Sequence, residues 1–213
     1  MRLTDDFGWL AIGDSHLARM LDHFSLHGLN TVSISGGLVR HVRTYLDSFN
    51  YFRGMLEGLF ILVGGNDLSK RDANPAGVAR QLEDLITEVT TRNPGCLIVT
   101  GSIVPRAVAG TVGEEFMTDC ETVDREISKW SVNHHHFVHD AFVGELVRRR
   151  GSAVEVGIRK EVYERDRVHL NEMGKGIFRS ILDYVIESCN RQDFTSKGEV
   201  GEKEDRRLVL WKF

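Results

Sequence analysis

Short apolar runs alternate along the chain with segments in which apolar residues recur every three or four positions. The runs, which we expect to be strands, lie at residues 7–12, 31–35, 59–63, 96–100 and 136–138. The periodic segments, which predict helices, lie at residues 17–24, 38–49, 78–89, 116–130 and 173–189. Strands that alternate with helices indicate βαβ units, and continuously apolar strands indicate a sheet covered on both faces. The pattern therefore predicts a doubly wound α/β fold with five parallel strands.

Glycine turns follow four of these runs, beginning at Gly13, Gly36, Gly64 and Gly101. In a doubly wound sheet, ligands bind in the crevice outside the carboxyl ends of the strands. The turns after the first three strands are therefore where we look for chemistry.

The composition indicates one globular domain over residues 1–190, followed by a charged tail, residues 191–213, whose end (208–213) is apolar again. That apolar end would dock on the body of the domain or on a partner. The three cysteines form no CxxC motif, which argues against a disulfide framework and fits a reducing compartment. Neither a signal peptide nor an apolar run long enough for a membrane span is visible, so we predict an intracellular, cytoplasmic protein.

The net charge of −4 disfavours a nucleic-acid-binding protein, since such domains normally carry a basic surface. One basic run, Arg148–Arg150, is the exception. We expect it to close a helix, where cations suit the helix dipole, with a phosphate-binding patch as the alternative. Nucleic acid is thus an unexpected partner but not an excluded one, and the sequence leaves the oligomeric state open.

The sequence Gly-Asp-Ser-His at residues 13–16 stands at a strand-to-helix turn. A serine there lies at the mouth of the crevice, where the helix N-terminus favours negative charge. These conditions suit Ser15 as a nucleophile whose substrate becomes an oxyanion. The alternative is that Ser15, or Asp14, only caps the helix.

Asp166 and His169 lie three residues apart, just before the last predicted helix. A serine nucleophile needs a general base and a third group that orients the base. His169 would take the proton of Ser15, and Asp166 would accept a hydrogen bond from the other ring nitrogen. The alternative is that Asp166 or Asn171 caps the helix and His169 is a surface residue.

Hydrogen-bond donors stand at the same predicted edge of the sheet. The amide of Asn66, the N–H of Gly36 and the N–H of Ser15 could converge on one developing oxyanion. The alternative for Gly36 and Asn66 is an ordinary turn at the end of a strand.

Together, the segments GDSH (13–16), SISGG (33–37), GGND (64–67) and DRVHLN (166–171) form a more specific pattern than any one of them. The set resembles the SGNH (GDSL-type) hydrolases over roughly residues 7–190. More loosely, it is similar to esterase-type domains of animal genomes and of retrotransposon open reading frames. Histidine at position 16 replaces the leucine of GDSL, and His-Leu-Asn stands where His-Pro-Asn is common; neither difference affects a catalytic group.

The resemblance implies a flavodoxin-like, three-layer α/β/α sandwich and an acyl hydrolase without metal or other cofactor. It implies Ser15 as nucleophile, His169 and Asp166 as the rest of a catalytic triad, and Gly36 and Asn66, with the Ser15 N–H, as the oxyanion hole. Because no segment resembles an apolar lid, we expect a short acyl group on a small-molecule ester. The rival interpretation is an idle fold of this type that binds RNA or protein.

Four more residues are weaker candidates for substrate contacts: His16, Gly37, Asp67 and Arg106. His16 would line the rim of the pocket, and Gly37 is the alternative to Gly36 as a donor. Arg106 could meet an acidic substrate or leaving group, the alternative being a solvated or salt-bridged arginine.

His134, His135, His136 and His139 suggest a zinc site. Consecutive residues near a strand point to opposite faces, whereas zinc ligands must converge on one tetrahedral centre. We therefore expect no metal.

Overall fold

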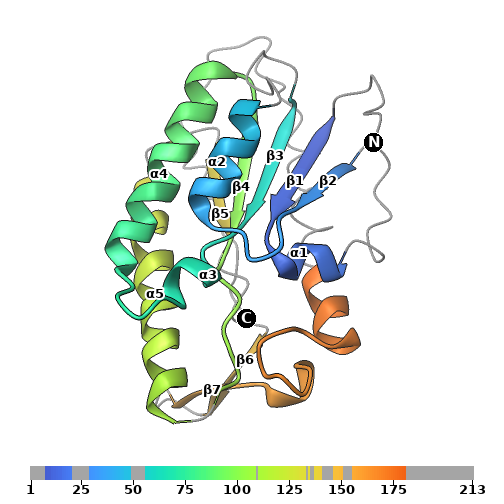
Figure 1. The fold of residues 1–213 in the computed structure, drawn as a ribbon, viewed down its shortest axis with the longest axis vertical. Coiled ribbons are helices and arrows are strands. Elements are labelled where there is room, and N and C mark those ends of the chain that lie inside the picture. The colour runs from blue at the N-terminus through green and yellow to red at the C-terminus, as the bar shows by residue number, and fades with distance from the viewer. Residues whose placement is uncertain are drawn as a thin grey trace, which may run out of the picture.

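The computed structural model describes residues 8–20, 29–48, 56–108, 110–132, 134, 137–140, 146–150 and 155–180 of the 213-residue chain (Figure 1). Of the strands at 137–140, 147–150 and 155–158, it describes the backbone. Cys189, the tail 191–213 and the predicted domain boundary at residue 190 lie outside the described residues.

A five-stranded sheet in the order β2-β1-β3-β4-β5 forms the centre of the fold, and every neighbouring pair is parallel (Figure 1). The strands are β1 (Trp9–Gly13), β2 (Leu29–Ser33), β3 (Gly58–Leu62), β4 (Leu97–Gly101) and β5 (Phe137–Asp140). Each lies within a few residues of an apolar run in the sequence. The predicted parallel, doubly wound sheet is confirmed. The prediction succeeded because strands buried on both faces appear in the sequence as unbroken apolar runs.

Helices follow the strands. They are α1 (Ser15–Met20), α2 (Val39–Ser48), α3 (Gly65–Leu68), α4 (Pro75–Arg92) and α5 (Thr111–Ser131), and residues 172–180 are helical as well. The start of α4 shows the local rules: Asn74 accepts a hydrogen bond from the Gly77 N–H at 3.1 Å, and Pro75 occupies the first turn. The one-turn helix α3 has no apolar stripe, so the periodicity did not predict it.

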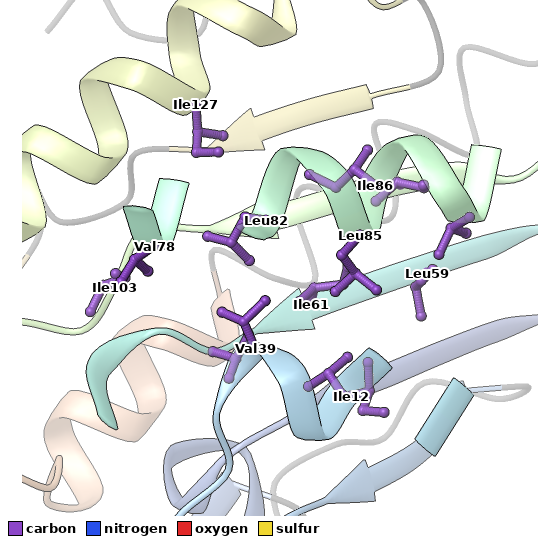
Figure 2. Close-up of a cluster of buried hydrophobic side chains, with 14 of the residues drawn as sticks. Ile12, Val39, Leu59, Ile61, Val78, Leu82, Leu85, Ile86, Ile103 and Ile127 are labelled. Atoms are coloured by element: carbon purple, nitrogen blue, oxygen red, sulfur yellow. The ribbon is translucent and has the colours of Figure 1, made fainter. Parts of the chain in front are cut away.

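Both faces of the sheet are covered, which makes the three layers. On one face, alternate residues of β1 and β3, such as Ile12 and Ile61, pack against α2, α4 and α5 (Figure 2). On the other face, Ala11 and Phe60 share a cluster with Leu17 of α1 and with Phe178. Burial of these apolar side chains stabilises the fold by about 1.5–3 kcal/mol for each large residue, before the entropy cost of folding is counted.

The basic run lies in a strand, so the expected helix end is wrong. β6 (Val147–Arg150) pairs in antiparallel fashion with β7 (Glu155–Ile158), with Arg149 opposite Val156. The dipole argument considered only charge, whereas a valine in each segment and the isoleucine of β7 favour strand pairing.

The order of the strands also positions the site. From β1 the chain passes to β2 on one side and then to β3 on the other, so the connections diverge between β1 and β3. A crevice opens at such a switch point, outside the carboxyl ends of the strands. The residues after β1 and β3 are those that the sequence picked out, Asp14 and Ser15 on one side and Asn66 on the other.

Candidate active site

Ser15 is the first residue of α1, and Asp14 caps that helix. Asp14 Oδ1 accepts a hydrogen bond from the His16 N–H at 2.9 Å, and the Asp14 carbonyl accepts from the Ala18 N–H at 3.1 Å. The Ser15 hydroxyl is therefore not needed as a cap. Its Oγ lies 3.2 Å from Nε2 of His169, a residue 154 positions further along the chain.

A tight loop holds His169 and Asp166. The Glu164 N–H donates to the His169 carbonyl at 2.8 Å, and the Arg167 N–H donates to the Glu164 carbonyl at 3.0 Å. Asp166 Oδ1 accepts from the backbone N–H groups of Val168 and His169 at 2.9 and 3.0 Å. Arg167 has φ of 61°, a left-handed conformation that costs a non-glycine residue roughly 1–2 kcal/mol. The loop thus sets the histidine and the aspartate in a fixed relation to each other.

The helix after this loop is capped by Asn171 and not by Asp166. Asn171 Oδ1 accepts from the N–H groups of Met173 and Gly174 at 3.0 and 3.1 Å, and Asn171 Nδ2 donates to the Glu161 carbonyl at 2.7 Å. Asp166 Oδ2 is consequently left for the ring of His169, whose Nδ1 lies 2.6 Å away.

The ionisation of Asp166 determines how the imidazole is protonated. Desolvation opposes ionisation, but the hydrogen bonds from the His169 ring and from two backbone N–H groups outweigh it, and the pKa of Asp166 is held well below its usual value. An ionised carboxylate only accepts hydrogen bonds, so Nδ1 of His169 carries the proton. In the neutral imidazole, Nε2 then carries a lone pair that can accept the hydrogen of the Ser15 hydroxyl.

Asn66, in α3, points toward the end of β1. Its Nδ2 donates to the Gly37 carbonyl at 3.1 Å and lies 3.4 Å from Asp14 Oδ2. Asp14 is 3% exposed, and its burial raises the pKa of this carboxyl to about 6, against lowering contributions from the His16 N–H and from nearby His169 and Arg106. Asp14 therefore links the serine turn to the asparagine.

The glycines after β2 adopt a turn beside Asp14. Gly36 has φ of 65°, the left-handed region in which glycine is favoured, and it is exposed. The Gly37 N–H donates to the Ile34 carbonyl at 2.8 Å. The Gly36 N–H has no partner among the described residues, and of these two N–H groups it is the one available as a donor.

His16 is a buried neighbour of the candidate base. Its ring lies 5.3 Å from the ring of His169, centroid to centroid, and the residue is 9% exposed. Desolvation, together with the positive charges that surround it, lowers the pKa of His16 to about 3. His16 is thus neutral at physiological pH and adds no charge that would oppose a protonated His169.

A small cavity of about 110 Å³ joins these groups. Ser15, His169, Asn66, His16 and Arg106 all line it, and its apolar walls come from Leu62, Val63, Ile103, Val104 and Val168. Gly36 and Gly37 are not among the residues that line it. Asp67 also lies away from it, because Asp67 Oδ2 accepts from the Val39 N–H at 3.1 Å, at the start of α2.

The loop after β4 supplies residues that the sequence did not single out. The Tyr163 hydroxyl donates to the Pro105 carbonyl at 2.8 Å, and the Ala107 N–H donates to the Arg167 carbonyl at 2.7 Å. These bonds fix the segment 103–107 to the loop that carries His169. The position of Ile103 and Val104 at the carboxyl end of a strand was a usable signal, but nothing in the sequence marked Tyr163.

Of the four clustered histidines, the structure describes the side chain of His134 alone. No group of three ligand-type side chains is found among the described residues. His134 stacks on the ring of Trp130, with centroids 3.7 Å apart, and its Nδ1 lies 2.8 Å from the Trp130 carbonyl. His135, His136 and the side chain of His139 lie outside the described part.

None of the described helices has the length and hydrophobicity that crossing a bilayer requires.

Comparison with solved structures identifies the fold. A GDSL-like lipase from Bacteroides thetaiotaomicron is similar, with a TM-score of 0.66, 16% identity, and coverage of 88% of this chain and 91% of that one. A lipase/acylhydrolase from Enterococcus faecalis gives a TM-score of 0.63, 13% identity, and coverage of 86% and 96%. A catalytic mutant of an acetylxylan esterase from Geobacillus stearothermophilus gives a TM-score of 0.59, 15% identity, and coverage of 87% and 96%.

No protein-family model matches the sequence, and comparison with curated proteins finds no match. At these identities the structural likeness establishes the fold. The chain adopts the three-layer α/β fold of the SGNH (GDSL-type) hydrolases, as its four sequence segments predicted.

Proposed function

We propose that this protein is a serine esterase that cleaves short-chain acyl esters through an acyl-enzyme intermediate. One observation carries the proposal: Ser15 Oγ lies 3.2 Å from His169 Nε2, while His169 Nδ1 lies 2.6 Å from an ionised Asp166, and the serine and histidine line the same cavity. That the structural neighbours described above include lipases and an acetylxylan esterase supports ester hydrolysis as the reaction class.

In the first step, Ser15 Oγ attacks the ester carbonyl carbon as its proton passes to Nε2 of His169. The imidazolium that forms is stabilised by Asp166, while neutral His16 beside it adds no repulsion. His169 then gives the proton to the oxygen of the departing alcohol as the carbon–oxygen bond breaks. The acyl group remains on Ser15.

In the second step, His169 removes a proton from water, and the resulting hydroxide attacks the acyl-enzyme. The bond to Ser15 Oγ breaks, Oγ regains its proton from His169, and the carboxylic acid leaves. Both steps pass through a tetrahedral intermediate with a negatively charged oxygen.

The donors that we assign to that oxyanion are the N–H of Ser15 and the side-chain amide of Asn66, which line the cavity, and the N–H of Gly36, which belongs to the turn beside Asp14 and does not line it. Asn66 is held by a 3.1 Å bond to the Gly37 carbonyl, while its contact with Asp14, at 3.4 Å, is near the upper limit for a hydrogen bond. The Asn66 N–H that faces Asp14, the longer of the two contacts, is the one that would turn to the oxyanion. Each such donor is worth about 2.7–4 kcal/mol of barrier.

The size of the cavity supports a short acyl group. Its volume of about 110 Å³ is well below the roughly 300–1,000 Å³ that is typical of pockets for drug-sized ligands. Acetyl and other small acyl groups are therefore the first substrates to test.

The test is hydrolysis of p-nitrophenyl acetate by the wild type, by Ser15→Ala and by the control Ser48→Ala. Ser48 is exposed at the end of α2, and its hydroxyl donates to the Thr44 carbonyl within the same helix. We expect Ser15→Ala to lose at least about 1,000-fold in kcat/KM with an unchanged circular dichroism spectrum, and Ser48→Ala to match the wild type. A fluorophosphonate should label Ser15 alone. Equal turnover by Ser15→Ala and the wild type would overturn the proposal.

A further inference from the structure

Arg106 is a half-buried cation in the wall of the cavity that contains Ser15 and His169. It follows β4 on the segment 103–107, and its guanidinium carbon lies 4.8 Å from the centre of the Phe116 ring. An arginine stacked on an aromatic face keeps its N–H groups at the edge of the guanidinium plane, where they are free to bind a ligand.

No acidic side chain among the described residues forms an ion pair with Arg106, and none of the hydrogen bonds found there uses its five N–H donors. The charge of Asp14 raises the pKa of Arg106, but the two side chains form no ion pair. The carboxylate oxygens of Asp14 face the His16 N–H and Asn66 instead. Arg92, by contrast, bonds both Asp47 and Glu88 on the surface.

A positive charge is costly when it is partly removed from water and, as for Arg106 among the described residues, no acidic side chain lies close to it. Desolvation accordingly lowers the pKa of Arg106, although a guanidinium remains protonated at any physiological pH. An anionic oxygen in the cavity would recover this cost through charge-assisted hydrogen bonds, which are strongest when arginine binds a carboxylate with two parallel N–H groups.

The position of Arg106 relative to the reacting groups is fixed. The Ala107 N–H donates to the Arg167 carbonyl, and the Tyr163 hydroxyl donates to the Pro105 carbonyl, so both neighbours of Arg106 are tied to the segment that carries His169. A carboxylate bound to Arg106 would therefore have a defined position relative to the base.

We propose that Arg106 is a specificity-determining residue that binds a carboxylate of the substrate, so that the site prefers anionic esters to neutral ones of the same shape. This inference rests on the proposed esterase function and adds the substrate class. The carboxylate can belong to the alcohol side or to the acyl side of the ester, and matched substrates distinguish the two.

For the alcohol side, the pair is 4-acetoxybenzoate and 4-acetoxyacetophenone, in which a methyl ketone replaces the carboxylate. For the acyl side, the pair is ethyl hydrogen succinate and ethyl 4-oxopentanoate, which differ in the same way. The quantity measured is the ratio of kcat/KM for the anionic ester to that for the neutral ester. Comparing this ratio between variants cancels effects that act on both esters equally.

We expect the wild type to prefer the anionic ester of at least one pair by roughly 10- to 100-fold, the range of a hydrogen-bonded ion pair. In Arg106→Gln the ratio should fall to near one, and in Arg106→Lys, which keeps the charge but not the planar fork, it should lie between. Arg125→Gln, which removes a charge from the exposed face of α5, should keep the wild-type ratio.

Binding provides a readout that does not require turnover. With Ser15→Ala, calorimetry should show tighter binding of the preferred anionic ester than of its ketone, and Ser15→Ala/Arg106→Gln should lose that difference. A ratio near one in the wild type for both pairs, or a ratio that Arg106→Gln leaves unchanged, would refute the role of Arg106 while leaving the esterase proposal intact. If neither the wild type nor Arg106→Gln hydrolyses any of the esters but ester binding still depends on Arg106, the esterase proposal fails and the proposed carboxylate site stands.

Discussion

Replacing Asp166 by asparagine separates the two roles of this side chain. The carboxylate accepts two backbone N–H groups through Oδ1, at 2.9 and 3.0 Å, and faces the His169 ring through Oδ2, at 2.6 Å. An asparagine that keeps its oxygen at the Oδ1 position retains the loop but presents an NH₂ group to Nδ1. The imidazole must then carry its proton on Nε2, where it can no longer accept the proton of Ser15.

The alternative orientation of the asparagine places its oxygen against the ring and its NH₂ group against the two backbone N–H groups. This costs both backbone bonds, each worth about 0.5–1.5 kcal/mol, so the unproductive orientation is preferred. Removing the acid of a buried triad lowers kcat by about 10⁴. Because the Asp166 side chain is 45% exposed and water can take over part of its role, we expect a smaller loss in kcat/KM, of about 10²–10³.

The assay is the initial rate of p-nitrophenyl acetate hydrolysis at neutral pH, with urea unfolding as the measure of stability. Asp166→Asn should unfold within about 1 kcal/mol of the wild type, whereas Asp166→Ala, which removes all three bonds, should lose stability as well as activity. If Asp166→Asn stays within about threefold of the wild-type kcat/KM, the tautomer argument is refuted.

Two further predictions concern stability. Burial raises the pKa of Asp14 from 3.8 to about 6, so the stability that the protonated carboxyl contributes is lost as pH rises through that range. In urea unfolding, the free energy of unfolding of Asp14→Asn relative to that of the wild type should therefore increase by about 2 kcal/mol between about pH 4 and about pH 7.5. A difference that does not change with pH would contradict the raised pKa. Tyr163→Phe leaves the buried Pro105 carbonyl without its 2.8 Å partner and should cost about 1–3 kcal/mol in the same assay, while a loss below about 0.5 kcal/mol would mean that water replaces the hydroxyl.

The sheet and its helices could be predicted because their signals are local. Buried parallel strands such as β3 are apolar at every position, and α4 carries an apolar stripe at helical spacing, so hydrophobic periodicity alone locates them. The β6–β7 hairpin was missed because its arginines follow neither pattern. The short helix α3 was missed because four residues are too few to show a period.

The candidate site was predictable in its residue types but not in its hydrogen bonds. Sequence alone left open whether Ser15 or Asp14 caps α1, and whether Asp166 or Asn171 caps the last helix. In both cases the cap is the residue that does not serve the proposed chemistry, Asp14 and Asn171. These choices depend on backbone geometry within one turn. The bond between Tyr163 and Pro105 spans 58 positions, and no local pattern encodes it.

The loop 164–169 is closed by its own backbone bond, so the base and its orienting acid form one small unit. The serine reaches that unit from 154 positions away, through the packing of Val162, Leu170 and Phe178 against one face of the sheet. Local loosening of that face would separate the hydroxyl from the imidazole without altering the internal hydrogen bonds of the loop. The rate of turnover would then report on how stably residues 162–178 pack against the sheet, and activity would be lost before the central sheet unfolds.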